Sequence, residues 1–345
     1  MRTSLKTTLI LAVAATAAFA LFKLNKTAEV EAINPTIHQT FVKWTAKHGK
    51  KYDTPKEFAY RLSVFAQKLK RMTELQKTID FKLALNKFSD LTKEEFKTKY
   101  TGLKISKAPR NIVTLDISND PPASIDWRTK GIVNKVKDQG QCGSCWAFSA
   151  VAATEAAWAQ AGNPLADFAE QQLVDCSSKQ GNQGCNGGWM DQAFNYFKIA
   201  ATELTSDYKY VARDQKCKAD PTKYVAQMKS YVDVTPKNPA QLQAAAATTV
   251  VSIAIDASDD VFMDYDSGII TSQCYNDLDH GVAIVGYGSE GTKKPINFWI
   301  VRNSWGSDWG ESGYVRIENT GSNDDGMCGI NMAPSYVTGI AKYSP

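Results

Sequence analysis

Cysteine is absent from the first 141 residues of this 345-residue chain, and the whole sequence contains only three histidines. The seven cysteines all lie between Cys142 and Cys328, so at least one thiol is left over once the others pair. Disulfides belong to oxidising compartments, where a thiol that stays free indicates a reactive group. His38 and His48 fall in the cysteine-free part, so His280 is the one imidazole in the cysteine-bearing part.

Long apolar runs are also scarce. The only one covers residues 9–22, follows Arg2 and Lys6, and contains the A-x-A cleavage pattern Ala-Phe-Ala at residues 18–20. Its 14 residues fall short of the roughly 20 that a spanning helix needs, which favours a signal peptide over a signal anchor. We therefore expect a signal peptide at residues 1–20, no membrane span, and entry into the secretory pathway toward a lysosome, a digestive vacuole or the extracellular medium.

Acidic charge is scarce only at the beginning of the chain. Residues 1–121 carry 22 basic and 11 acidic side chains, whereas residues 122–345 carry 18 basic and 25 acidic ones. Opposite net charges favour docking of the two parts on each other. A basic segment can also bind nucleic acid, but no binding motif accompanies this one, so we expect no nucleic-acid partner.

Reactive side chains occur in three separate blocks. Cys145 lies in Q-G-Q-C-G-S-C-W-A-F, His280 in L-D-H-G-V-A, and Asn303 in V-R-N-S-W-G. A histidine can serve as the base for a thiol, and a side-chain amide can orient the imidazole, so the three residues form a nucleophile, its base and its orienter. The alanine-rich run after Ser144 predicts a buried helix to Gln160 with Cys145 in its first turn, where the helix dipole favours thiolate.

Together these blocks resemble the papain-like cysteine proteases, most closely their cathepsin L-like branch. C-G-S-C-W is the family signature, and His280 and Asn303 follow Cys145 by 135 and 158 residues. The resemblance implies an α+β, papain-like two-domain fold with a helical left domain and a β-barrel-like right domain. Cys145 and His280 would meet across the cleft between them, with no cofactor and no metal.

The resemblance also assigns site residues. Gln139 would complete an oxyanion hole with the backbone N–H of Cys145, and Trp305 would shield the histidine–asparagine pair from water. Of the 15 pairings that six cysteines allow, the family selects Cys142–Cys185, Cys176–Cys217 and Cys274–Cys328. The expected substrate-binding residues are Gly143, Gly187, Gly188, Trp189, Met190, Ala254, Leu278, Asp279, Gly281, Trp305 and Ala333.

Five of these residues are expected to form the subsite for the substrate residue two before the scissile bond. They are apolar or small and include no acid: Met190, Ala254, Leu278, Gly281 and Ala333. An unpaired charge is costly to bury in such a pocket, so we expect Leu, Phe or Val to be accepted and Arg to be disfavoured.

The part before residue 121 resembles the inhibitory propeptide of the same family. Glu57, Arg61 and Phe65 share one helix face and match E-x3-R-x3-F, the first half of the family's helical motif. The residues at the later positions of that motif do not match. Residues 84–90 match the motif G-x-N-x-F-x-D, with Ala84 in place of glycine. An ordinary helical hairpin is the alternative. We expect an α-helical inhibitory propeptide at residues 21–120 and a mature peptidase at residues 121–345.

The expected function is that of a cysteine endopeptidase made as a zymogen. It would be a monomer that acts on protein and peptide substrates, with its own propeptide as intramolecular inhibitor and cystatin-like inhibitors as further partners. Three alternatives stay open: a transpeptidase or ligase on the same fold, a non-catalytic secreted binding protein, and a leader that also inhibits in trans. A zinc site at Cys142, Cys145 and His280 is disfavoured because no second C-x2-C pair accompanies them.

Overall fold

The computed structural model describes residues 35–344 except 107, 109 and 119. The predicted signal peptide at residues 1–20 therefore lies outside the described residues. The described residues divide into two compact units, one formed by residues 35–71 and 89–91 and the other by residues 72–88 and the described part of 92–344.

The first unit is a helical pair with an aromatic core. Helix α2 (Pro35–Lys47) and most of helix α3 (Pro55–Leu75) belong to it. The Phe41 ring, which is fully buried, lies 5.1 Å from Phe65 and 5.7 Å from Trp44. The helical expectation for this segment is confirmed, with a break between residues 47 and 55 where the chain turns.

Polar contacts in the same unit involve the residues of the first propeptide motif. Arg61 lies 3.8 Å from the Glu57 carboxylate and donates to the backbone oxygen of Asp90 at 3.1 Å. The Asp90 carboxylate also accepts from Lys50 and Tyr52 at 2.8 and 2.9 Å. Asp90, the last residue of the second motif, is thus held by side chains of the helical pair.

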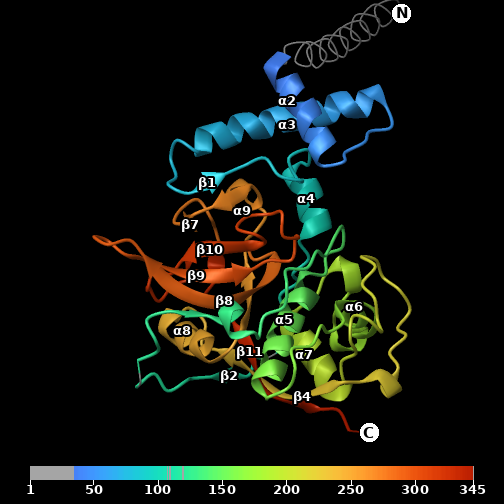
Figure 1. Cartoon of the computed structure of the whole chain (residues 1–345), viewed down its shortest axis with the longest axis vertical. Helices are drawn as coiled ribbons and strands as arrows, with labels where there is room; N and C mark the ends of the chain where they lie inside the picture. The colour runs from blue at the N-terminus through green and yellow to red at the C-terminus, as the bar shows by residue number, and fades with distance from the viewer. Residues whose placement is uncertain (1–34, 107, 109, 119, 345) are drawn as a thin grey trace, which may run out of the picture. The chain divides into compact units, whose positions relative to one another are not determined.

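The second unit has a helical half and a strand-rich half, as the α+β prediction requires (Figure 1). The helical half contains α5 (Cys145–Gln160), α6 (Glu170–Cys176) and α7 (Met190–Ile199). Helix α5 is apolar nearly all round because seven of its 16 residues are alanine, and 13 of the 16 are buried. This helix therefore passes through the core, with the helices on one side and strands β8 and β11 on the other.

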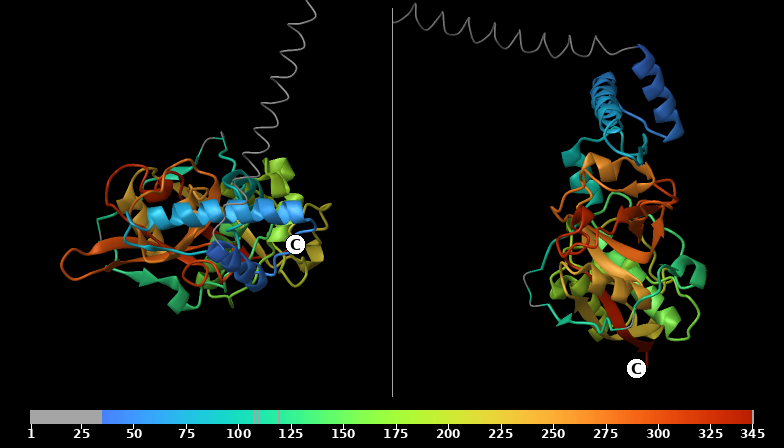
Figure 2. Two further views of the ribbon diagram at one scale, coloured as in Figure 1. Left: turned by 90° about the horizontal axis from the view of Figure 1, so that it is seen from above. Right: turned by 90° about the vertical axis from the view of Figure 1, so that its left-hand side faces the viewer.

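The strand-rich half is built on a nine-stranded sheet with the order β2-β4-β11-β5-β8-β9-β10-β7, and β3 pairs with β8. Its strands are β2 (Ile112–Val113), β3 (Ile125–Asp126), β4 (Ala226–Val234), β5 (Val251–Ile255), β7 (Ile269–Ile270), β8 (His280–Glu290), β9 (Ile296–Arg302), β10 (Tyr314–Glu318) and β11 (Ser335–Lys342). The long strands β8 and β9 lie near its middle, and the view from above shows the same division into halves (Figure 2, left).

Shorter elements complete this unit. A separate two-stranded sheet joins β1 (Lys82–Leu83) to β6 (Tyr265–Ser267). The remaining helices are α4 (Lys93–Tyr100), α8 (Pro239–Thr248), α9 (Asp260–Met263) and the 3₁₀ turns Trp127–Lys130, Ser178–Gln180, Gly184–Asn186, Pro221–Lys223 and Met327–Gly329. Thr92 caps α4 in a full capping box with Glu95, so this helix begins at a position set by sequence.

Strand register brings the second and third reactive blocks together. His280 is the first residue of β8 and pairs with Ile255 of β5. Three residues later, Ala283 pairs with Arg302, the last residue of β9. Asn303 therefore follows the strand end that lies next to the beginning of β8. Three disulfides join Cys142 to Cys185, Cys176 to Cys217 and Cys274 to Cys328, the pairs that the family resemblance implies, and Cys145 is free.

Candidate active site

The free thiol of Cys145 lies at the start of the central helix. Cys145 is the first residue of α5 and is fully buried. Burial raises the pKa of its thiol to about 12, while the backbone N–H groups of Gly281, Trp146 and Cys145 act in the opposite direction. Two of these N–H groups belong to the first turn of the helix, so the backbone supplies the thiolate stabilisation expected at a helix N-terminus.

The imidazole of His280 is held by Asn303. His280 Nε2 lies 2.8 Å from Asn303 Oδ1, and that oxygen also accepts from the backbone N–H of Ser304 at 2.7 Å. Because an amide oxygen only accepts, Nε2 carries the proton and Nδ1 is the basic nitrogen. Nδ1 is buried and makes no hydrogen bond to the described residues, so its lone pair is available to a reacting group.

Trp305 covers the histidine ring. The two ring centroids are 4.6 Å apart, and Trp305 is fully buried. Phe88 and Phe96 contact the same indole edge-on at 5.4 and 5.1 Å. Burial lowers the pKa of His280 to about 4, while the hydrogen bond to Asn303 opposes the shift.

Gln139 presents its amide beside the cysteine helix. Its Oε1 accepts from Ser304 Oγ at 2.7 Å, which fixes the orientation of the amide. Its Nε2 then donates to two backbone oxygens, of Cys142 at 2.9 Å and of Tyr100 at 3.1 Å. The carbonyl of Tyr100, at the end of α4, therefore occupies the donor that the sequence predicts for an oxyanion hole.

The residues after Tyr100 pair with backbone on two sides. On one side the N–H groups of Gly102 and Leu103 donate to the carbonyl oxygen of Asp279 at 3.0 and 2.9 Å. On the other side Gly188 donates to the oxygen of Gly102 and accepts from the N–H of Lys104, both at 2.9 Å, as a parallel bridge. The segment 100–104 is thus bound in extended form between the two halves of the second unit.

Close approach of backbones makes glycine necessary here. A Cβ on Gly102 would lie 2.2 Å from the carbonyl oxygen of Gly143, and one on Gly187, whose φ is +116°, would lie 2.4 Å from the oxygen of Gly102. Neither distance is compatible with a side chain. The predicted substrate-binding glycines are therefore the positions at which the bound segment comes closest to the helical half.

The side chain of Leu103 enters an apolar cluster. Leu103 is 9% exposed and shares this cluster with the residues predicted to bind the second substrate residue before the scissile bond. Those in the cluster or packed against it are Met190, Ala254, Leu278 and Ala333, while a Cβ on Gly281 would meet the sulfur of Met190 at 3.2 Å. Trp189 is buried in the same cluster and donates its indole N–H to Asp191 at 2.8 Å.

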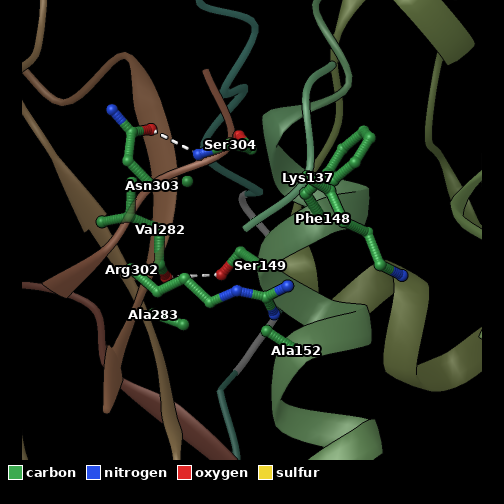
Figure 3. Close-up of a pocket in the computed structure, with 10 residues that line it drawn as sticks. Lys137, Phe148, Ser149, Ala152, Val282, Ala283, Arg302, Asn303 and Ser304 are labelled. Atoms are coloured by element: carbon green, nitrogen blue, oxygen red, sulfur yellow. Dashed lines mark hydrogen bonds between the residues drawn. The ribbon is translucent and has the colours of Figure 1, made fainter. Parts of the chain in front are cut away.

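A small cavity between α5 and the sheet is lined by residues that include Ser149, Arg302 and Asn303 (Figure 3). Its volume is about 10 Å³, too small for a substrate. Ser149 of α5 donates to the oxygen of Val282 at 2.6 Å, and the side chain of Arg302 extends from β9 toward the helix. This cavity is a packing feature of the site rather than a binding pocket.

Buried ion pairs extend this contact. Glu155, which is 1% exposed and lies on α5, binds Lys137 at 2.9 Å and faces Arg302 at 3.7 Å. Burial opposes the charge on Lys137, but Glu170 and Glu155 outweigh it and raise the pKa of the ammonium group. The helix that begins with Cys145 is therefore tied by charge to the residue that precedes Asn303.

Several residues of this site were not found by sequence reasoning. Gly102 and Leu103 carry no motif, and Ser304 is part of a motif but was assigned no role. Glu155 could have been found from the rarity of charge inside an apolar helix pattern, and Arg302 from the charge that ends an apolar strand pattern. Among the described residues, no group of three or more histidine, cysteine, aspartate or glutamate side chains could hold a metal ion, and no helix is long and apolar enough to cross a membrane.

This arrangement defines a class of protein: thiol hydrolases that are made as precursors with a segment of their own chain bound in the cleft. The sequence model of the papain family cysteine proteases matches residues 121–338, and that of the cathepsin propeptide inhibitor domain matches residues 41–96. The chain belongs to the papain family of cysteine proteases and carries a cathepsin-type propeptide.

Curated relatives and solved structures agree with this assignment. The chain is 41% identical over 305 residues to the senescence-specific cysteine protease SAG39 of Oryza sativa, covering 86% of this chain and 88% of the relative. It is 41% identical over 302 residues to digestive cysteine proteinase 3 of Homarus americanus, covering 85% and 92%. Digestive procathepsin L 3 of Tenebrio molitor matches with a TM-score of 0.78 at 36% identity, covering 88% of this chain and 99% of the other.

Proposed function

We propose that residues 121–345 form an endopeptidase in which Cys145 attacks the scissile carbonyl and His280 transfers the proton. The observation that supports this most directly is the hydrogen bond from Gln139 Nε2 to the backbone oxygen of Tyr100, because a peptide carbonyl already occupies the predicted oxyanion donor. A fixed donor of this kind contributes about 3 kcal/mol to stabilising a tetrahedral intermediate.

In the proposed mechanism the thiol proton passes to Nδ1 of His280 as the sulfur becomes the nucleophile. The sulfur forms a bond to the carbonyl carbon, and negative charge develops on the oxygen beside Gln139 and the N–H of Cys145. His280 then donates its proton to the leaving amine, and water, deprotonated by the same imidazole, releases the acid from the thioester. Asn303 keeps the ring in one orientation and one tautomer during both steps.

The propeptide inhibits, in this proposal, by occupying the substrate's own backbone positions. Leu103 pairs with Gly188 in parallel, and its side chain lies in the subsite predicted for the second residue before the scissile bond. A substrate would use the same backbone groups of Gly188 and Asp279. Removal of the segment by cleavage near residues 120–122 then frees the cleft.

We expect the mature enzyme to prefer leucine over arginine two residues before the scissile bond by at least about a hundredfold in kcat/KM. None of the five residues predicted to form this subsite is an acid, so burying a guanidinium among them is unfavourable. The measurement compares fluorogenic peptides with Leu-Arg and Arg-Arg before the leaving group, after the precursor has been processed at pH 4 to 5. In the Ala333→Glu variant the kcat/KM values for the two peptides should lie closer together. Equal kcat/KM values for both peptides in the wild type would exclude this subsite assignment.

We expect the thiol of the precursor to react with iodoacetamide only at alkaline pH. In the precursor burial raises the pKa of Cys145 to about 12 and lowers that of His280 to about 4, so the thiol and the imidazole are both neutral between these values. Release of the propeptide removes part of this burial and allows the thiolate–imidazolium pair. Mass spectrometry of carbamidomethylated Cys145 from pH 4 to 9 measures the profile.

The shape of the profile separates this effect from simple steric cover. Cover alone lowers the rate by one factor at every pH, whereas the altered pKa values move the rise of the curve. The remaining six cysteines are in disulfides, so they do not contribute to the signal. Profiles of the same shape for precursor and mature enzyme would contradict the expectation.

Routing and partners follow from the same assignment. We propose passage through the secretory pathway toward a lysosome, digestive vacuole or the medium, in keeping with the disulfides. Relatives include a KDEL-tailed cysteine endopeptidase of Arabidopsis thaliana and the digestive proteinase of Homarus americanus. Protein and peptide substrates, and cystatin-like inhibitors in the same cleft, are the proposed partners of the monomer.

A further inference from the structure

The linker between the propeptide and the mature enzyme binds at a second place, away from the cleft. Strand β2 pairs in parallel with the end of β4, with Ile112 opposite Asp233 and Val113 opposite Val234. In the strand order β2 is outermost and β4 comes next, at the end of the sheet that also holds β11 (Figure 1). Departure of β2 therefore leaves an open edge on β4.

The guanidinium of Arg110, two residues before β2, makes several hydrogen bonds to the sheet and to the segment before β11. Nε and Nη2 of Arg110 donate to Asp233 Oδ1 at 3.1 and 2.9 Å. Nη1 and Nη2 donate to the backbone oxygens of Met332 and Pro334 at 3.3 and 2.9 Å. Asp233 is 1% exposed, and the guanidinium thus satisfies a buried carboxylate and two carbonyl groups at once.

The backbone on either side of β2 is also recognised. The N–H of Asn111 donates to Asp233 Oδ2 at 2.7 Å, and the N–H of Asp233 donates to the oxygen of Asn111 at 2.9 Å. The side-chain amide of Gln241, on α8, accepts from the N–H of Leu115 at 2.6 Å and donates to its oxygen at 2.9 Å. These contacts bind an extended peptide at both ends of a six-residue stretch.

A second carboxylate adds to the charge of this place. Asp191 is 9% exposed, and burial raises its pKa to about 6, with Asp233 acting in the same direction and Arg110 opposing. The Asp233 and Asp191 carboxylates therefore act on each other, and the guanidinium of Arg110 binds the first of them. Once the linker is gone, their mutual repulsion favours either a proton or a new cation.

We propose that the processed enzyme retains this place as a binding site for peptide segments in which an arginine is followed by an extended stretch of backbone. In this binding site, Asp233 and the carbonyl groups of Met332 and Pro334 hold the arginine side chain, and Gln241 holds the backbone at Leu115. Its binding groups differ from those that hold Leu103 in the cleft, and Met332 and Pro334 flank Ala333 of the subsite for Leu103. The inference rests on processing of the precursor, which is part of the proposed function.

The test uses processed enzyme whose Cys145 has been alkylated by a peptidyl epoxide that fills the cleft. The probe is a fluorescent synthetic peptide with the sequence of residues 110–118, R-N-I-V-T-L-D-I-S, followed by fluorescence polarisation. We expect saturable binding that is the same with and without the epoxide. The peptide with Arg110→Gln should bind at least about tenfold more weakly, because charge-assisted hydrogen bonds are lost.

A protein variant gives the complementary measurement. Asp233→Asn should weaken binding of the arginine peptide by a similar factor, whereas Glu318→Gln, on β10, serves as the matched control without effect. Equal binding of the two peptides, or loss of binding once the cleft is filled, overturns the proposal. The peptide pair decides the question even if Asp233→Asn fails to fold.

The outcome is independent of catalysis. An active enzyme that shows no arginine-dependent binding contradicts the arginine site alone. A protein that binds the peptide but neither hydrolyses substrate nor reacts with the epoxide contradicts the proposed function instead; for such a protein the binding is measured without the epoxide.

Discussion

Cys145→Ala should reduce peptide-bond hydrolysis by about 10⁴-fold or more, because removal of a covalent nucleophile leaves only binding and the oxyanion donors. The substitution removes one sulfur atom from the first turn of α5, so the fold should persist. The measurement is hydrolysis of a Phe-Arg fluorogenic peptide after incubation at pH 4 to 5. Wild-type activity should appear as the propeptide is lost.

A matched control is needed, since the variant cannot process itself. Trace amounts of mature wild-type enzyme, inactivated afterwards with an epoxide, can remove the propeptide of the variant. The epoxide also reports the loss of the thiol, because it should label the wild type and not the variant. Undiminished hydrolysis by processed Cys145→Ala would rule out the thiol mechanism. Absence of hydrolysis by the processed wild type would favour the non-catalytic binding protein.

Gly102→Ala should expose the Cys145 thiol of the uncleaved precursor. The added methyl group would lie 2.2 Å from the carbonyl oxygen of Gly143, a distance that forces the segment out of the cleft. We expect the initial rate of Cys145 labelling by a vinyl-sulfone probe at neutral pH to rise by at least about tenfold. A tenfold rise requires that the substitution weaken binding of the segment in the cleft by only about 1.4 kcal/mol.

The control is Ile105→Ala, a change at a side chain that is 57% exposed. It should leave labelling at the wild-type rate. Mature enzymes released from both variants should have the wild-type kcat/KM, because neither residue remains in the mature chain. An unchanged labelling rate for Gly102→Ala would show that another part of the propeptide blocks the thiol.

Much of the fold could be predicted from local sequence. The run of small residues after Ser144 predicts a helix that can be buried on all sides, and the structure begins α5 at Cys145. The apolar runs around residues 252–256 and 282–287 predict strands, which the structure has as β5 and β8. These features depend on neighbours in the sequence, so a single chain reveals them.

Contacts that join distant segments could not be predicted in this way. The hydrogen bond between Arg110 and Asp233 joins residues 123 positions apart, and no periodicity links them. Leu103 is an ordinary leucine in sequence, and only its position between Gly188 and Asp279 gives it significance. Strand register likewise decides that His280 lies beside Asn303, and register depends on the whole sheet.

The buried charges on α5 have a consequence for the time course of activation. Glu155 links the helix of Cys145 to the strand end at Asn303 through contacts that involve no residue of the propeptide. The two sides of the site are therefore already aligned in the precursor, and cleavage uncovers a finished site. Activity should accordingly appear at the rate at which the cut propeptide dissociates, without a lag from refolding.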